Sequence, residues 1–363
     1  MAASTIPLRP LGVVAAYSII AATVIGMLYY GRTLLMPLAI AILIWHLISA
    51  LAATYHRPTL AGRHLPSWLC YIAALTTIFG ALAIMAELIS DNVNQVSEAA
   101  PAYEDNLRQL LTATYELIGL KSAPSFAQIA DQISVGGIVT TVAGTLGGVA
   151  SGAGLVVVYV VFMLFEQRCF DSKLHALMPD RGRAERLRAV LGRISRQIEG
   201  YVWVKTLTSL LTGVVSFVIM WGVGVDFAEF WALVIFLLNF IPIIGAMLGV
   251  IFPSLLALVQ FETIGPFLIV SSALTVTQFV VGNLIEPRLM GRQLNLSPLV
   301  IILSLAFWGA LWGIVGMILC VPIAVIIMIV CGHFRPTRPV AIMLSADGVV
   351  PEFAAPAEHP TAL

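Results

Sequence analysis

The chain has 363 residues, of which 60% are hydrophobic and only 10% are charged, and its formal net charge is zero. A soluble domain carries about 25% charged residues. This sequence is therefore too apolar to cover a water-facing surface, and it predicts an all-α polytopic membrane protein. Zero net charge excludes a global attraction for nucleic acid. The expected surroundings of the chain are the lipid bilayer, with no nucleic acid as a partner.

The N-terminal region, residues 1–90, is predicted to contain three membrane spans. Each is a run of about 20 apolar residues, the length that crosses a bilayer core: Leu11–Tyr30, Leu34–Tyr55 and Trp68–Ile89. The next segment, 91–134, has a helical pattern with one apolar and one acidic face. It is predicted to be an amphipathic segment on the periplasmic side of the membrane.

A fourth span is predicted over residues 135–165, and it is rich in glycine. Gly144, Gly148 and Gly152 lie four residues apart, on one face of a helix. Such spacing lets two helix backbones approach closely, so helix packing is the predicted role; a phosphate-binding loop is the alternative. The basic segment 166–200 follows with an amphipathic pattern. It is predicted to lie on the membrane or on neighbouring spans, with docking of a partner as the alternative.

Two further apolar runs, Tyr201–Val225 and Ile264–Ile285, are predicted to be the fifth and sixth spans. Lys205 lies one turn inside the fifth span, where its side chain can reach the membrane surface. The two remaining apolar stretches, 227–260 and 298–331, do not fit simple spans. Each would be about 51 Å long as a single helix, whereas the bilayer core is roughly 30 Å thick.

Helix-breaking or polar residues stand at the centres of both long stretches: Asn239, Pro242 and Gly245 in the first, and Gly309, Gly313 and Gly316 in the second. Proline removes a helical donor and glycine permits a turn. Broken backbone inside a membrane is tolerated only where protein buries it or where it lines a wet cavity. These patterns predict six full spans plus two re-entrant hairpins. Residues 201–331 would form a transport core of two inverted repeats, each a span followed by a hairpin.

The alternative is eight simple spans with two kinked helices, in which the same glycines serve as close-packing pairs. The distribution of arginine favours the hairpins, because Lys and Arg gather in short cytoplasmic loops. The arginine-rich segment 166–200 is then cytoplasmic, and both termini follow it. With two hairpins Arg288 and Arg292 are cytoplasmic as well. The tail, residues 332–363, contains five prolines and is predicted to be disordered.

Polar groups near the breaks are candidate ligands for a solute or an ion. An unpaired buried amide costs roughly a few kcal/mol, so Asn239 is expected either to cap the broken helix or to bind a solute. Gln278 and Asn283 either line the same cavity or hold helices together. Glu286 lies where the sixth span leaves the membrane. It forms an interfacial ion pair with one of the arginines in the following loop, or it is a carboxylate that exchanges a proton or sodium.

A family resemblance is carried by three blocks that start at Tyr201, Asn239 and Gly282: YVWVKTLTSLLTG, NFIPIIGAMLGVIFPSLLAL and GNLIEPRLMGRQLNLSPLVIILSLAFWGALWGIVGMILCVPIAV. They resemble the autoinducer-2 exporter (AI-2E) family of bacterial membrane proteins. The resemblance implies a multi-pass transporter of the inner membrane that forms a homo-oligomer, with a pentamer as one option. Family members are linked to export of the quorum-sensing signal autoinducer-2, and some to sodium or proton exchange.

Motifs of other function classes are absent from the sequence. There is no GxxxxGK[ST] loop for ATP and no HExxH or GxSxG motif, so neither a primary pump nor an enzyme is predicted. The four cysteines lack metal-ligand spacing, so no metal or cofactor is expected. The predicted function is secondary transport, or export, of a small polar organic molecule. A non-transporting scaffold or sensor and a channel are the alternatives.

Overall fold

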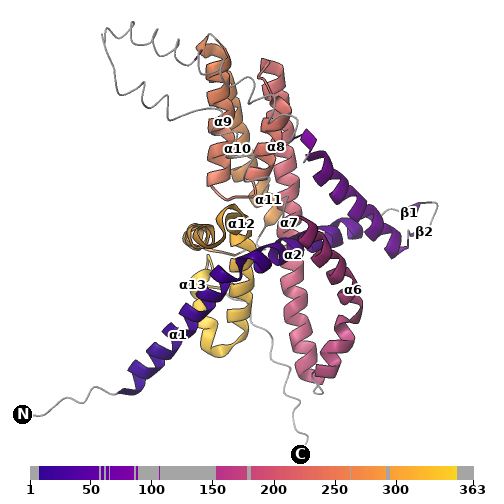
Figure 1. Ribbon diagram of the computed structural model, residues 1–363, viewed down its shortest axis with the longest axis vertical. Helices are drawn as coiled ribbons and strands as arrows, with labels where there is room; N and C mark the ends of the chain where they lie inside the picture. Colours follow the sequence, from indigo (N-terminus) through magenta and orange to yellow (C-terminus); the bar gives the residue numbers. More distant parts are fainter. Residues whose placement is uncertain are drawn as a thin grey trace, which may run out of the picture.

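The computed structural model describes residues 8–56, 59–60, 63–64, 66–85, 87–88, 106, 153–177, 181–261, 263–291 and 295–349. Its elements in chain order are α1 (Leu8–Tyr30), α2 (Arg32–His56), β1 (Thr59–Leu60), β2 (Arg63–His64), the helix Ser67–Met85, α6 (Ala153–Leu177), α7 (Arg181–Val223), α8 (Ala228–Leu238), α9 (Ile244–Gln260), α10 (Ile264–Val280), a π-helical turn (Val281–Ile285), α11 (Glu286–Met290), α12 (Pro298–His333), a 3-10 turn (Arg335–Thr337) and α13 (Arg338–Leu344). The two strands form a short antiparallel pair, and every other element is helical (Figure 1).

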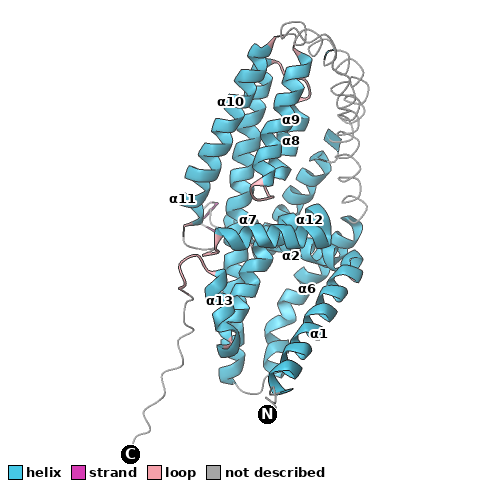
Figure 2. Cartoon of the chain, turned by 90° about the vertical axis from the view of Figure 1, so that its left-hand side faces the viewer, coloured by secondary structure: helices cyan, strands magenta, loops and turns pink. Residues whose placement is uncertain are grey.

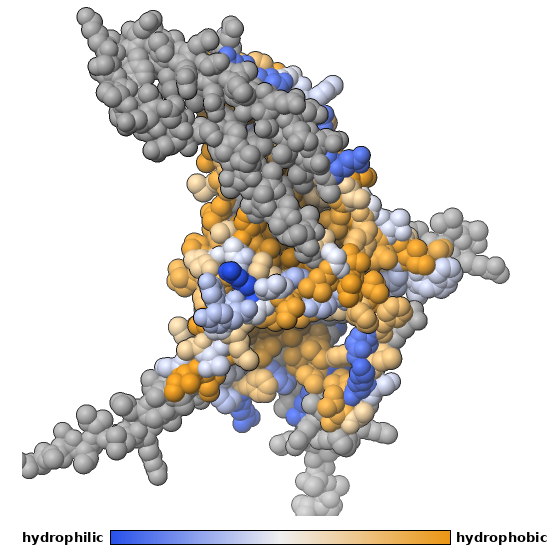
Figure 3. All heavy atoms as spheres, in the orientation of Figure 1, coloured by the Kyte–Doolittle hydropathy of each residue, from blue (hydrophilic) through white to orange (hydrophobic). Residues whose placement is uncertain are grey.

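The described helices confirm an all-α polytopic membrane protein. Five of them are long and apolar enough to cross a membrane: Arg32–His56, Ser67–Met85, Ala184–Val223, Ile264–Met290 and Pro298–His333. Large apolar side chains remain on the outside, such as Trp221, which is 69% exposed. Apolar residues cover much of the face seen in Figure 3. An exposed apolar area of this kind is stable against lipid and unfavourable in water.

Helix α7 is the longest described element, and it continues across residue 200, where the sequence divides the basic segment from the fifth span. It runs unbroken for 43 residues, about 64 Å, and joins half of the basic segment to the fifth span. Val190 and Ile198 pack in one apolar cluster with α12, so the amphipathic face of the basic segment is buried against a neighbouring helix. No proline interrupts this stretch, which is why the helix continues. In Figures 1 and 2, α8, α9 and α10 gather beside one half of α7, and α6, α12 and α13 lie toward the other half.

The first long stretch is a helical hairpin, with α8 and α9 as its arms. Gln260, at the end of α9, donates from Nε2 to the Gly224 carbonyl at 2.8 Å and accepts from the Asp226 backbone N–H at 2.8 Å. Both partners precede α8, so the stretch returns to the end from which it started. With 11 residues, α8 is about 16 Å long and too short to cross a bilayer alone.

The second long stretch is also broken where the sequence predicts. Gly313 has φ +61° and ψ −140° inside α12, a conformation open to glycine and strained for other residues. A Cβ added to Gly316 would lie 1.9 Å from the Trp308 carbonyl oxygen. Residues eight apart are separated by about 12 Å along a straight helix, so the chain bends sharply at Gly313.

The C-terminal tail differs from its prediction, because residues 335–349 are ordered. The 3-10 turn caps α12 through Thr337, whose hydroxyl donates to the Cys331 carbonyl at 2.9 Å. Helix α13 follows and buries Ala341 fully. Prolines 336 and 339 stand at the first positions of these two short helices, where a missing N–H costs nothing. Two of the five prolines that suggested disorder therefore start helices, and the other three lie outside the described residues.

Candidate functional site

A row of buried polar side chains runs along one face of α7, inside the bundle that it forms with α8, α9 and α10. These residues recur at three- and four-residue spacing and are at most 7% exposed: Lys205, Thr208, Ser209, Thr212 and Ser216. We call this row the polar seam. Two hydroxyls of the seam donate to backbone carbonyls one turn earlier, which satisfies them within α7. The seam is the largest set of buried polar groups in the described part of the chain.

One end of the seam is a buried ion pair between α7 and α11. Lys205 Nζ donates to both carboxylate oxygens of Glu286, at 2.8 and 3.0 Å, and the two side chains are only 8% and 18% exposed. The expected partner of Glu286 was Arg288 or Arg292. Arg292 lies outside the described residues, and the partner that the structure gives Glu286 is Lys205, which binds both carboxylate oxygens. The Lys205 side chain, which the sequence placed where it can reach the membrane surface, lies buried against Glu286.

The π-helical turn Val281–Ile285 directly precedes Glu286 and sets its direction. A π-turn holds one residue more than an α-turn, so side chains beyond it are rotated relative to a regular helix, and such turns are frequent at functional sites. Asn283, within this turn, is exposed and donates to the Phe279 carbonyl of its own segment at 3.2 Å. The structure therefore separates Asn283 from the seam, although the sequence grouped it with Gln278.

Asn239 joins the first break to the middle of the seam. Its Nδ2 donates to Ser209 Oγ at 3.0 Å, and both residues are buried. Asn239 also ends α8, with its backbone N–H bonded to the Ile235 carbonyl. Of the two alternatives expected of Asn239, the structure places it at the end of α8 with its amide bonded to Ser209, and binding of a solute stays a prediction.

The turn of the hairpin, just beyond Asn239, is strained. Ile243 has φ +64° and ψ −63°, and the Ile244 N–H bonds the Pro242 carbonyl at 2.6 Å. This is the rarer form of γ-turn, and a β-branched residue with positive φ is a genuine outlier. Pro242 is half-buried, and Ile243 is 53% exposed.

Two glycines of α9 allow close contacts with α8 and α10. A Cβ on Gly245 would lie 1.7 Å from the Leu238 carbonyl oxygen, and one on Gly249 would lie 3.2 Å from Gln278 Nε2. That Nε2 atom is buried and has no hydrogen-bond partner among the described residues. Buried unpaired donors are rare in native proteins and call for a water, an ion or a ligand. Asn239, Gly245, Gly249 and Gln278 thus lie along adjoining turns of the same bundle.

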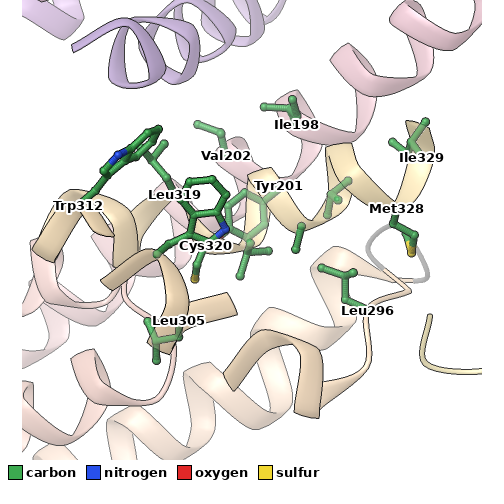
Figure 4. Close-up of a cluster of buried hydrophobic side chains, with 14 of the residues drawn as sticks. Ile198, Tyr201, Val202, Leu296, Leu305, Trp312, Leu319, Cys320, Met328 and Ile329 are labelled. Carbon is green, nitrogen blue, oxygen red and sulfur yellow. The ribbon is translucent and has the colours of Figure 1, made fainter. Parts of the chain in front are cut away.

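The second break has a different, apolar environment. Gly309 faces the Met317 side chain, and Gly316 packs on the Trp308 carbonyl. The ring centroids of Trp308 and Trp312 lie 5.0 Å apart, with the ring planes tilted by 55°. Figure 4 shows this cluster, with Tyr201 of α7 beside Cys320 of α12. Tyr201 lies one turn before Lys205, so α7 connects the apolar cluster around the second break to the polar seam.

Three further features relate the sequence to the structure: the glycine stripe, the expected absence of a metal and the polar residues of α7. Gly144, Gly148 and Gly152 lie outside the described residues. No group of three His, Cys, Asp or Glu side chains that could hold a metal occurs among the residues searched, which are those that the structure describes. Sequence reasoning missed the seam itself. Its signal was present as five polar residues at positions i, i+3, i+4, i+7 and i+11 of an otherwise apolar span, which places them on one face of a helix.

Comparison with known proteins decides the family. The AI-2E family transporter model matches residues 17–335. The chain belongs to this family. It is 31% identical to the AI-2 transport protein TqsA of Escherichia coli (strain K12) over 286 residues. This match covers 77% of this chain and 81% of TqsA.

Other relatives of this AI-2E family member have less specific names. A putative transport protein of Haemophilus influenzae is 31% identical over 320 residues, which cover 85% of this chain and 91% of the relative. The putative transport protein YhhT of Escherichia coli (strain K12) is 32% identical over 277 residues, 75% of this chain and 76% of YhhT. The relatives support a transport role in the membrane and leave the solute open.

Proposed function

We propose that this AI-2E family protein is a secondary transporter that exports a small polar organic molecule, such as autoinducer-2, with a proton or sodium gradient as the energy source. It would lie in the bacterial inner membrane with both termini in the cytoplasm, as a homo-oligomer. The name of TqsA supports this class of solute. The observation that carries the proposal is the polar seam with its terminal Lys205–Glu286 pair.

The physical argument starts from the cost of burying charge. Two charges taken out of water lose several kcal/mol of hydration each, and their attraction repays this only in good geometry. An apolar pair of similar volume is often as stable. Ionisable groups inside a membrane protein mark ion or substrate pathways by default. The seam adds hydroxyl groups; Thr208 and Thr212 donate within α7, so their oxygens remain as acceptors for a solute that carries hydroxyls.

Glu286 is the residue proposed to carry the coupling. When its carboxylate takes up a proton, the attraction to Lys205 is lost and α11 is free to move relative to α7. Movement there would open the seam at one end, and release of the proton would re-form the pair. Gln278, whose amide donor has no partner, would bind the solute in the middle of the bundle. The two re-entrant hairpins stay a prediction about how this bundle meets the bilayer.

The test is transport in proteoliposomes with an imposed gradient. Glu286→Gln keeps the shape of the side chain and removes its charge. We expect it to abolish accumulation of solute against its gradient while passive exchange continues. Glu166→Gln is the matched control, because it breaks the exposed ion pair with Lys173 on α6, whose side chains are 55% and 60% exposed.

Three outcomes separate the alternatives. Normal accumulation in Glu286→Gln would remove this residue from coupling. Flux of the wild-type protein that never exceeds equilibration would indicate a channel. Absence of any flux for a panel of small polar solutes would favour a scaffold or sensor.

A further inference from the structure

The C-terminal segment that follows α12 packs back onto the loop that precedes α12. Leu296 and Ser345 form an antiparallel β-bridge. It is flanked by two backbone hydrogen bonds, from Ser297 N–H to the Leu344 carbonyl and from Ala346 N–H to the Asn295 carbonyl, both 3.0 Å. We call residues 338–349 the strap. The strap therefore ties the two ends of α12 together.

Side-chain contacts hold the strap at a single residue of the loop. Asn295 Nδ2 donates to Asp347 Oδ1 at 2.8 Å and to the Val349 carbonyl at 2.9 Å. Asp347 also accepts from the Val349 N–H at 2.9 Å. Asn295 has φ +36°, in the left-handed region that Asn tolerates better than most residues. Asparagine therefore serves this position in two ways: its backbone tolerates the positive φ, and its side chain makes both hydrogen bonds to the strap.

The position of the strap links it to the proposed site. Glu286 begins α11, α11 ends at Met290, and the strapped residues 295–297 lead directly into α12. Leu296 is 7% exposed and belongs to the apolar cluster that contains both Tyr201 of α7 and the second break. Residues 295–297 are thus the described part of the connection between α11 and α12, and the strap holds them at the start of α12.

The strap is built to come undone more easily than the helices around it. It has one β-bridge in place of a ladder, and its helix α13 has seven residues. The hydrogen bonds of Asn295 with Asp347 and Val349 are exposed to solvent, and Val349 is 62% exposed. Exposed hydrogen bonds characterise the parts of a protein that open first, and here they lie at the end of the strap, beyond the buried Ala341 and Ser345.

We propose that the strap is a latch that holds the α11–α12 loop in the described state and undocks during each transport cycle, so that α12 can shift relative to Glu286. This inference rests on the proposed transport function. A strap that stays docked throughout the transport cycle would have the same contacts. The experiment must therefore show whether the strap has to undock for transport to occur. The geometry of the bridge provides the means.

Leu296 and Ser345 form the non-hydrogen-bonded kind of antiparallel pair, because the two backbone bonds flank them. Cα atoms of such pairs are about 4.5 Å apart, within the range of about 4.4 to 6.8 Å that a disulfide needs. The double variant Leu296→Cys/Ser345→Cys, in the full chain, should therefore cross-link under a mild oxidant. The wild-type protein, with its four native cysteines, receives the same oxidant as the control.

The expected result is a loss of flux of at least tenfold on oxidation of the double variant, fully restored by reduction, with the wild type unaffected. Full flux in protein shown by mass spectrometry to carry the cross-link would overturn the latch. Failure of the disulfide to form would also overturn it, because the bridge would then be absent in the membrane. If the double variant shows no flux even in its reduced form, the substitutions have disturbed folding. The truncations described next then test whether the strap holds the loop.

Two truncated proteins test, without a transport assay, whether the strap holds residues 295–297 in place. Ending the chain after Met343 removes the Leu344 carbonyl that accepts from Ser297 N–H and the Asp347 and Val349 partners of Asn295, whereas ending it after Val349 leaves every strap contact in place. Hydrogen–deuterium exchange at Ser297 should speed up at least tenfold in the shorter protein only. Equal exchange in both truncations would show that the strap does not hold the loop. If wild-type flux is absent while this difference in exchange persists, the proposed function fails and the docking of the strap stands.

Discussion

Gly245→Ala is the sharpest test of how the first hairpin is closed. The new Cβ would lie 1.7 Å from the Leu238 carbonyl oxygen, and separations below 3.0 Å essentially never occur, so the backbone must move by about 1.3 Å. The Leu238 carbonyl also accepts the Ile241 N–H at 2.8 Å, and that bond lies in the path of the movement. Overpacking costs about 1 to 3 kcal/mol, and the lost hydrogen bond adds about 0.5 to 1.5 kcal/mol.

The predicted loss is therefore about 3 kcal/mol, measured as thermal unfolding of the protein in detergent. At about 2 to 4 °C per kcal/mol for a large domain, the midpoint should fall by roughly 6 to 12 °C. Gly249→Ala should cost less, because its neighbour at 3.2 Å is the end of the Gln278 side chain, which can turn away.

Gly265→Ala is the matched control. It also adds one methyl group to a helical glycine, but no atom lies within 4 Å of its Cβ position. Alanine is the better helix former by about 0.8 to 1 kcal/mol, so the control should be neutral or slightly stabilising. Equal midpoints for Gly245→Ala and Gly265→Ala would refute the close contact at the turn of the hairpin.

Two further predictions concern single hydrogen bonds. Asn239→Ala leaves the fully buried Ser209 hydroxyl without its donor and should cost about 1 to 3 kcal/mol; adding Ser209→Ala should recover part of that loss, and no recovery in the unfolding midpoint would contradict the pairing. Trp312→Phe removes the indole donor to the Leu28 carbonyl of α1 at 3.0 Å and should cost about 0.5 to 1.5 kcal/mol. Faster hydrogen exchange confined to the end of α1 should accompany it, and unchanged exchange there would argue against the contact.

Local features of the chain were predictable because their causes are local. Composition alone indicates a membrane protein, and run lengths indicate where helices lie. Pro242 and Gly313 end or bend helices through their own backbone chemistry, so both breaks stand where the sequence predicts. The continuity of α7 was missed because the change from basic to apolar residues at residue 200 looks like the end of one segment. Such a change shows where the surroundings of the chain change from water to lipid, and a helix can continue across it when no helix-breaking residue is present.

The sequence by itself determined the class of this protein, its helices and its two breaks, since hydrophobic length and backbone preference depend on neighbours along the chain. Only the tertiary structure decided which groups meet. Lys205 and Glu286 are 81 positions apart, and their pairing depends on which faces of α7 and α11 come together. The same holds for Asn295 and the strap, 52 positions apart. A buried charge must find an opposite charge in space, and only the packing of distant helices determines which one it finds.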